Sequence, residues 1–241
     1  MADGNAMKPV LMSASERIAF ERPGLLARLR ALFTGTRAVS RVADDAAFQP
    51  YRQLARQLLA DFPCAEGGRI VFVAGVDGLP TDTLLNMAYF LCEEIGSRLL
   101  IIDAADHDTA VGARLGLAGM AGLHDLVRDG SRRLSELAHP TARPGIAVLA
   151  SGRRPSDGAA ALPSAAVERV LDEARKSYDY TLVQLPSVLD YPAFLRFAGF
   201  ADALLLIVRE GRTDFSSLAR SRALLDNLGV ANVRVVLCGA D

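Results

Sequence analysis

From about residue 69 onward, the chain alternates between short continuous apolar runs and longer stretches in which apolar residues recur at helical spacing. A short apolar run bounded by turn residues is typical of a strand buried on both faces, whereas the longer spacing is typical of an amphipathic helix. Strands that alternate with helices, without a linker between them, predict an α/β fold with one doubly wound, mostly parallel sheet. We expect the first strand to be central. The predicted strands are 70–74, 99–103, 146–150, 180–185, 203–209 and 233–238, and the predicted helices are about 81–95, 109–115, 121–128, 132–138, 163–177, 189–198 and 214–228.

The residues ahead of this alternation carry much less pattern. We therefore divide the chain into a flexible N-terminal tail, residues 1–43, and one domain, residues 44–241. A helix that starts near Pro50 and runs to about Phe62 opens the domain, because proline is favoured in the first turn of a helix.

The tail contains one short amphipathic stretch at about residues 24–33. Its apolar side chains fall on one helical stripe, and Arg28 and Arg30 lie off that stripe. A short basic amphipathic helix can dock in a groove of a partner protein, lie on an anionic membrane or pack on its own domain, and the sequence leaves these alternatives open. The residues of this apolar stripe are Leu25, Leu26, Leu29, Leu32 and Phe33.

Composition and charge narrow the classes of function. A formal net charge of −1 over 241 residues weighs against a protein that binds nucleic acid through bulk electrostatics. The three cysteines are widely spaced and the three histidines form no ligand motif, so we expect reduced thiols, no metal site and a cytoplasmic location. No apolar run approaches the roughly 20 residues that span a bilayer.

The stretch from Arg69 to Ala88 reads as a strand, a glycine-bearing loop and a helix N-terminus, which is the architecture of a phosphate-binding loop. A working loop has the pattern G-x-x-x-x-G-K-[ST], in which backbone amides and one lysine surround the phosphates. Counted on this pattern, Leu79 replaces the glycine, Pro80 replaces the lysine and Thr81 stands at the magnesium ligand. Proline provides neither a cation nor a backbone N–H, so the frame of the site is present without its chemistry. The degenerate phosphate loop consists of Gly75, Val76, Asp77, Gly78, Leu79, Pro80, Thr81 and Asp82.

Two carboxylates, Asp77 and Asp82, place negative charge where a phosphate would bind. We expect the hydroxyl of Thr81 and one of these carboxylates to accept hydrogen bonds from the first amides of the helix. The loop would then be a closed structural turn that repels a triphosphate.

Further motifs follow the phosphate loop in a fixed order. They are Leu115-Gly-Leu, Gly122-Leu-x-Asp-Leu, Gly145-x-Ala-Val-Leu-x-x-Gly152 and Ser177-Tyr-Asp-Tyr180. In order and spacing, residues 47–241 resemble the cytoplasmic domain of the bacterial tyrosine kinases, which are MinD/ParA-like deviant P-loop proteins. The resemblance implies a P-loop NTPase-like fold, ATP and magnesium as the ligands of active members, and a role in capsule or exopolysaccharide assembly.

The departures from the family pattern fall at the positions that the resemblance assigns to chemistry. The Walker B aspartate is replaced by Gln184, a neutral amide that is a poor ligand for magnesium. Of the acidic D-x-D motif only Asp103 remains, either as a polar group of the crevice or as a helix cap at a strand end. Arg209 and Arg212 follow another strand and are either residual anion contacts or solvated loop arginines. The degenerate acidic positions are Asp103, Ala105, Gln184 and Pro186.

These departures favour a catalytically inactive protein, with no catalytic residue and no cofactor, that is a scaffold or regulatory partner in bacterial exopolysaccharide or capsule synthesis or export. The alternative is a weak tyrosine kinase or ATPase that binds ATP or ADP with magnesium through relocated groups such as Arg153, Arg154 or Arg209. A ParA- or MinD-like positioning protein is less favoured because the net charge is close to zero.

The resemblance also implies partners. They are proteins of an inner-membrane polysaccharide complex, and the chain pairs with itself or with an active relative. No nucleic acid is expected, and residues 24–33 offer a peripheral contact with the inner face of the cytoplasmic membrane.

Overall fold

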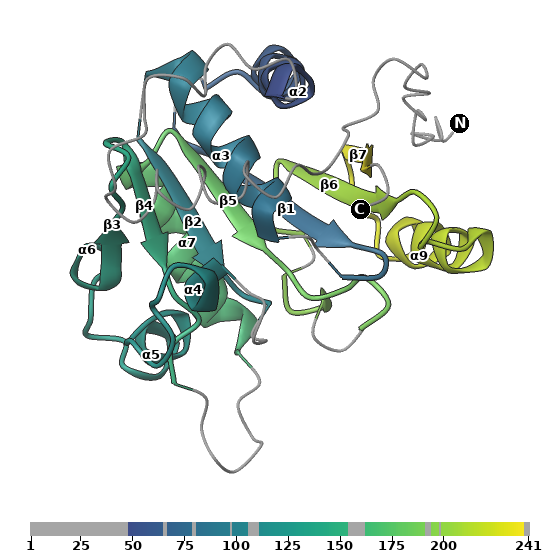
Figure 1. The fold of residues 1–241 in the computed structure, drawn as a ribbon. Helices are drawn as coiled ribbons and strands as arrows, with labels where there is room; N and C mark the ends of the chain where they lie inside the picture. The colour runs from purple at the N-terminus through teal and green to yellow at the C-terminus, as the bar shows by residue number, and fades with distance from the viewer. Residues whose placement is uncertain are drawn as a thin grey trace.

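The computed structural model describes residues 48–64, 67–78, 81–96, 98–105, 111–153, 162–190, 194–197 and 199–238. Its strands are β1 (Arg69–Gly75), β2 (Leu99–Asp103), β3 (Ala138–Pro140), β4 (Ile146–Leu149), β5 (Tyr180–Gln184), β6 (Ala203–Arg209) and β7 (Val233–Cys238). They form one sheet in the order β3-β4-β2-β5-β1-β6-β7, and every neighbouring pair is parallel except β3 and β4 (Figure 1).

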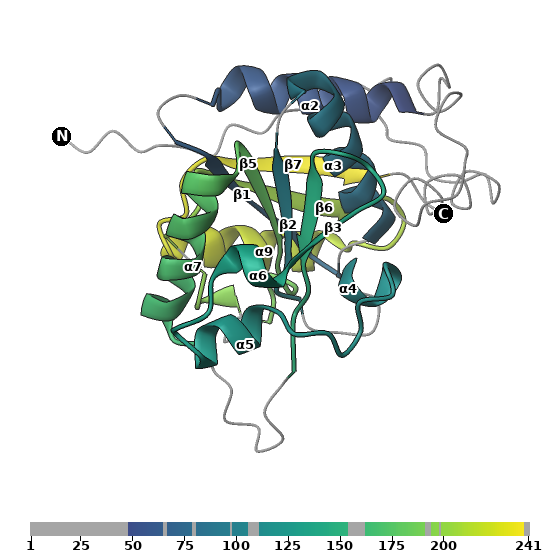
Figure 2. The same ribbon diagram turned by 90° about the vertical axis from the view of Figure 1, so that its left-hand side faces the viewer.

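Helices cover both faces of this sheet (Figures 1 and 2). On one face, α2 and α3 pack over the sheet and share a buried apolar cluster with it. On the other face, α5, α6, α7 and α9 bury their apolar residues in a second cluster. The described helices are α2 (Gln49–Asp61), α3 (Thr81–Ile95), α4 (Val111–Arg114), α5 (Leu123–Arg128), α6 (Leu134–Leu137), α7 (Ser164–Ser177) and α9 (Phe215–Asn227).

The doubly wound, mostly parallel sheet that the sequence predicts is confirmed. The helix predicted from Pro50 begins at Gln49, with proline in its first turn. The expected central place of β1 needs a correction, because β5 is the middle strand and β1 lies beside it, between β5 and β6.

The edge strand β3 was not predicted. The sequence pattern extends a helix over 132–138, whereas the structure ends α6 at Leu137 and continues directly into β3. This strand has three residues and ends at Pro140, so it contains no apolar run that could announce it.

Several predictions concern residues outside the described ranges. The tail of residues 1–43, including its apolar stripe, lies there, as do Leu79, Pro80 and Arg154. No helix in the described part of the chain is long and apolar enough to cross a membrane.

The register of the sheet brings the carboxyl ends of three strands together. In this register, Gln184 of β5 is paired with Val73 of β1 on one side and with Asp103 of β2 on the other. In open parallel sheets, this edge is where ligands bind, because the loops that follow the strands open there.

Substitution of Phe72, in β1, tests how much the buried side chains of the sheet contribute to stability. The side chain of Phe72 is 2% exposed and meets the ring of Phe197 edge-on, with 6.1 Å between ring centroids. We expect Phe72→Ala to lower the free energy of unfolding by about 3–5 kcal/mol, since it removes a large buried side chain and leaves a cavity. Urea denaturation measures this change.

The matched control is Phe215→Ala, because Phe215 is 84% exposed. Its effect should stay within about 0.5 kcal/mol. Equal effects of the two substitutions would contradict the packing described here.

Candidate functional site

The degenerate phosphate loop leaves the end of β1 and is held by the strands on either side. The amide of Val76 donates to the carbonyl of Ile207 in β6 (3.1 Å), and the hydroxyl of Ser187, after β5, donates to the carbonyl of Val76 (2.6 Å). Arg209, at the end of β6, donates from its Nη2 to the carbonyl of Asp77 (2.7 Å). Gly78 has a φ of +86°, a conformation that suits glycine. The described part of the loop is therefore a supported turn.

Asp103 and Gln184 are buried at the ends of β2 and β5, and both accept hydrogen bonds from the start of α4. The amide of Val111 donates to Oε1 of Gln184 (2.9 Å), and the amide of Gly112 donates to Oδ2 of Asp103 (2.9 Å). The other oxygen of Asp103, Oδ1, accepts from the amide of Ala105 (3.3 Å). The side-chain oxygens of both residues are thus engaged by the protein's own backbone.

Gly112 fits this arrangement because it lacks a side chain. A Cβ built on it would lie 2.9 Å from Oδ2 of Asp103 and 3.5 Å from Cβ of Ala150. The close approach of backbone to carboxylate leaves little space between α4 and the end of β2.

A third link joins α4 to the start of α3. The guanidinium of Arg114 donates to both carboxylate oxygens of Asp82, at 3.1 and 3.0 Å. This ion pair gives Asp82 a partner that the sequence did not predict, since we expected Asp77 or Asp82 to accept from amides of the helix. Through its three links, α4 connects the ends of β2 and β5 with the first turn of α3.

The hydroxyl of Tyr51, in α2, is buried against α3, the helix that follows the loop. Tyr51 is 2% exposed, and burial raises the pKa of its hydroxyl, while the nearby side chains of Asn86 and Thr83 act in the opposite sense. The phenol is therefore neutral across the physiological pH range. Tyr51 of α2 thus packs against α3.

His124 belongs to the same edge of the sheet, at the start of α5. Its amide donates to the carbonyl of Ser151, after β4 (2.9 Å). Burial lowers the pKa of the imidazole, and the positive charges of Arg196 and Arg128 lower it further, against the opposing effect of Asp125. Within the described residues, no cluster of three or more histidine, cysteine, aspartate or glutamate side chains could hold a metal ion.

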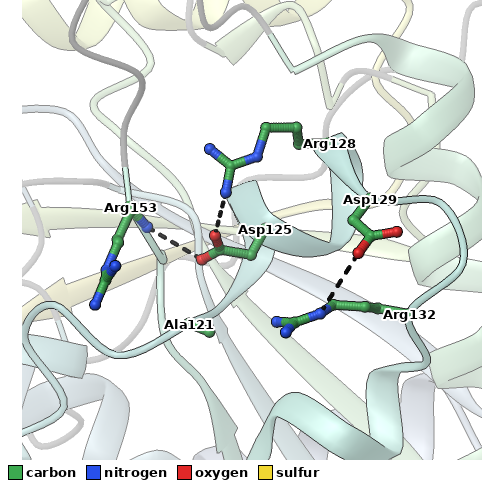
Figure 3. Close-up of a pocket in the computed structure, with 6 residues that line it drawn as sticks. All are labelled: Ala121, Asp125, Arg128, Asp129, Arg132 and Arg153. Atoms are coloured by element: carbon green, nitrogen blue, oxygen red, sulfur yellow. Dashed lines mark hydrogen bonds and ion pairs between the residues drawn. The ribbon is translucent and has the colours of Figure 1, made fainter.

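The remaining residues singled out from sequence are spread along this edge. Arg153 lies beside α5, where its Nε donates to the carbonyl of Gly119 (3.3 Å) and its amide faces Asp125 (Figure 3). Arg212 is exposed in the turn after β6, and Pro186 is buried in the loop after β5. The structure thus brings together the phosphate loop, Asp103, Gln184 and Arg209, and sets Arg153 apart beside α5.

The sequence pattern predicted a helix over about 109–115, where the structure has α4, but not the contacts that α4 makes. Two of its three links are made by backbone amides, of Val111 and Gly112, which every non-proline residue carries. Such a contribution leaves no signature in residue types. Arg114 was a visible signal, but its partner is 32 residues away in the chain.

The comparisons with known proteins agree with the fold described above. No family model matches the chain. A protein of Ralstonia solanacearum named as a tyrosine-protein kinase, EpsB, is 28% identical over 196 residues, which cover 81% of this chain and 26% of the relative. Among solved structures, the kinase domain of the Escherichia coli tyrosine kinase ETK matches with a TM-score of 0.67 and 20% identity, over 82% of this chain and 77% of that one.

The chain is thus related to bacterial tyrosine kinases. MinD of Aquifex aeolicus has a similar fold and matches with a TM-score of 0.55 and 20% identity, over 70% of this chain and 69% of that one. The chain spans about a quarter of the length of the EpsB relative. The resemblance inferred from the sequence motifs is confirmed at the level of the tyrosine kinase domain and its P-loop fold.

The attachment of α4 can be tested through Asp103. We expect Asp103→Ala to lower the free energy of unfolding by about 1–3 kcal/mol, because it leaves the amides of Gly112 and Ala105 without their acceptor in a buried place. Guanidinium chloride denaturation measures the loss.

Asp226→Ala is the control, since Asp226 forms an exposed ion pair with Arg222, with side chains 57% and 54% exposed. Removing it should change stability by at most about 1 kcal/mol. If Asp103→Ala were as mild as this control, the two hydrogen bonds to Asp103 would not hold α4 in place.

Proposed function

We propose that this chain is a catalytically inactive relative of the bacterial tyrosine kinases that acts as a scaffold or regulatory partner in polysaccharide synthesis or export. The observation that supports this most directly is the occupation of Asp103 and Gln184 by backbone amides of α4. These are the two positions at which active relatives, by the resemblance, hold magnesium and its water.

The ligands that this edge of the sheet offers do not suit a magnesium nucleotide. Magnesium demands near-ideal octahedral coordination by oxygen, and it is usually bound through one or two carboxylates. At this edge of the sheet, Gln184 offers a neutral amide oxygen that already accepts from Val111. The carboxylate of Asp103 would have to give up its bonds to Ala105 and Gly112 before it could serve a metal ion.

The phosphates would meet a second obstacle. Phosphoryl transfer depends on electrostatic stabilisation of the developing charge, mainly by a lysine and the metal ion. Pro80 stands at the lysine position, and Asp82 with its bound Arg114 stands at the first turn of α3. The residues present do not fit a magnesium nucleotide, and we derive no catalytic step through one.

One observation keeps a second candidate open, a weak nucleotide-binding kinase. Arg209 lies against the phosphate loop and is only partly buried, so its guanidinium is the one cation placed to meet a phosphate among the described loop contacts. The hydrogen bond to the Asp77 carbonyl ties up one of its nitrogens, which favours the structural role.

We expect no measurable magnesium-dependent ATP hydrolysis and no autophosphorylation by the unmodified chain. A variant that restores the family residues, with Leu79→Gly, Pro80→Lys, Asp82→Thr and Gln184→Asp, should bind ATP at least tenfold more tightly, equivalent to about 1.4 kcal/mol. Calorimetry with ATP and magnesium measures both proteins.

The control for this experiment carries Asp82→Thr alone, which releases Arg114 without restoring the lysine or the carboxylate. It should bind no better than the unmodified chain. Equal, micromolar binding by the unmodified and the restored proteins would instead support the weak-kinase candidate, with Arg209→Gln as the variant that then loses affinity.

The apolar stripe of residues 24–33 is proposed as the docking segment for a protein partner, with the membrane or the domain itself as the other outcomes. Five large apolar side chains on one stripe are each worth roughly 1.5–3 kcal/mol when buried. We expect deletion of residues 1–34 to abolish retention of a protein partner in pull-downs from the native host. If the stripe binds the membrane or its own domain instead, the deletion should reduce membrane association or lower the melting temperature. If the deletion changed neither partner retention, membrane association nor thermal stability, the stripe would have no docking role.

A further inference from the structure

A pocket of about 400 Å³ opens beside α5, and Figure 3 shows the residues that line it. Since Arg153 follows β4, the pocket lies at the carboxyl edge of the sheet on the β4 side. Three arginines from two segments line it, together with two aspartates and one alanine. Its lining residues are Ala121, Asp125, Arg128, Asp129, Arg132 and Arg153. A pocket of this size falls at the small end of ligand sites, which usually measure about 300–1,000 Å³.

Asp125 lies at the floor of this pocket, and its carboxylate charge is compensated by donors of the protein itself. Its side chain is only 9% exposed. One oxygen accepts from the amides of Gly122 (3.0 Å) and Arg153 (3.2 Å), and the other accepts from the guanidinium of Arg128 (2.7 Å). Asp125 therefore fixes the loop after β4 against α5, and its carboxylate is already compensated by three donors.

The backbone around this aspartate leaves no freedom. A Cβ on Gly152 would lie 2.7 Å from Oδ2 of Asp125, and a Cβ on Gly122 would lie 2.0 Å from the carbonyl oxygen of Ala150. Since there is no space for a Cβ at either position, the backbone that carries Arg153 is closely packed against Asp125 and α5.

The guanidinium groups are available to an incoming ligand. The Nε of Arg153 contacts the carbonyl of Gly119, and its two terminal nitrogens have no partner among the described residues. Arg132 meets Asp129 at 3.6 Å, with side chains 43% and 51% exposed, and exposed pairs of this kind contribute little to stability. Arg128 keeps 60% of its side chain exposed while it contacts Asp125.

We propose that this pocket binds a phosphate monoester group. Three guanidinium groups against two carboxylates leave one net positive charge, and one of those carboxylates is satisfied internally. Guanidinium forks match phosphate oxygens in pairs, and a phosphate monoester is close to a dianion at neutral pH. The size of the pocket admits the phosphate and a small attached group.

Asp129 is the residue that opposes this binding. Hydrogen bonds from the hydroxyl and the amide of Ser131 lower the pKa of its carboxyl, so it remains ionised at neutral pH. Its substitution by asparagine should therefore strengthen binding, whereas substitution of the arginines should weaken it. These opposite signs distinguish a defined site from general attraction to a basic surface.

The test is a titration of the full chain with phenyl phosphate, followed by NMR and calorimetry at low salt. We expect saturable binding that Arg132→Gln and Arg153→Gln each weaken by at least about fivefold, as for the loss of a partly exposed charge-assisted hydrogen bond. Asp129→Asn should tighten it by about twofold or more. Phenol, which lacks the phosphate, should not bind.

Arg222→Gln and Asp226→Asn are the matched controls, because this pair on α9 has the same 3.6 Å separation and similar exposure. Both should bind like the unmodified chain. Tighter binding of phenyl phosphate than of inorganic phosphate would identify a phosphorylated side chain or metabolite as the ligand, and equal binding would identify free phosphate.

Three results would overturn the proposal. They are the absence of saturable binding, equal weakening by Arg222→Gln, and loss of binding in Arg209→Gln with retention in both Arg132→Gln and Arg153→Gln. The last would place the anion at the phosphate loop instead.

Discussion

Two hydrogen bonds at the carboxyl edge of the sheet, from Val111 to Gln184 and from Gly112 to Asp103, decide what this edge can do. They place the start of α4 over the ends of two neighbouring strands, and the pair of Arg114 with Asp82 carries the connection on to α3. The side-chain oxygens of Asp103 and Gln184 are thereby engaged by backbone amides of the protein itself. A ligand that needs the same oxygens must displace backbone amides, which are costly to leave unpaired in a buried place.

The core of the sheet and its carboxyl edge are held together by different interactions. The strands contribute their stability through side chains buried on both faces of the sheet, in two apolar clusters. The residues at the strand ends contribute mainly through hydrogen bonds that fix loops. The amide oxygen of Gln184 accepts a backbone hydrogen bond from α4 without carrying a charge. The stability of the sheet and the hydrogen bonds at its edge thus depend on different residues of this chain.

Much of the fold could be predicted because it depends on pattern. Continuous apolar runs announced six of the seven strands, and the seventh, β3, escaped because three residues that end in Pro140 carry no pattern. The site was predictable only as far as side-chain identity reaches, which is why Gln184 and Asp103 were found and Val111 and Gly112 were not. The partner of Asp82 could not be read either, since the pairing with Arg114 depends on how α4 is seated on the sheet. The basic pocket beside α5 needed the tertiary structure too, because the loop after β4 brings Arg153 to Arg128 and Arg132.

The central claim is that α4 keeps its place over Asp103 and Gln184 even when nucleotide is present. Hydrogen exchange at the amides of Val111 and Gly112, measured with and without saturating ATP and magnesium, tests this claim most directly. We predict strong protection at both amides and no change on addition of the nucleotide. Loss of protection at these amides on addition of ATP and magnesium would contradict the account, because it would mean that the nucleotide competes with α4 for the ends of β2 and β5.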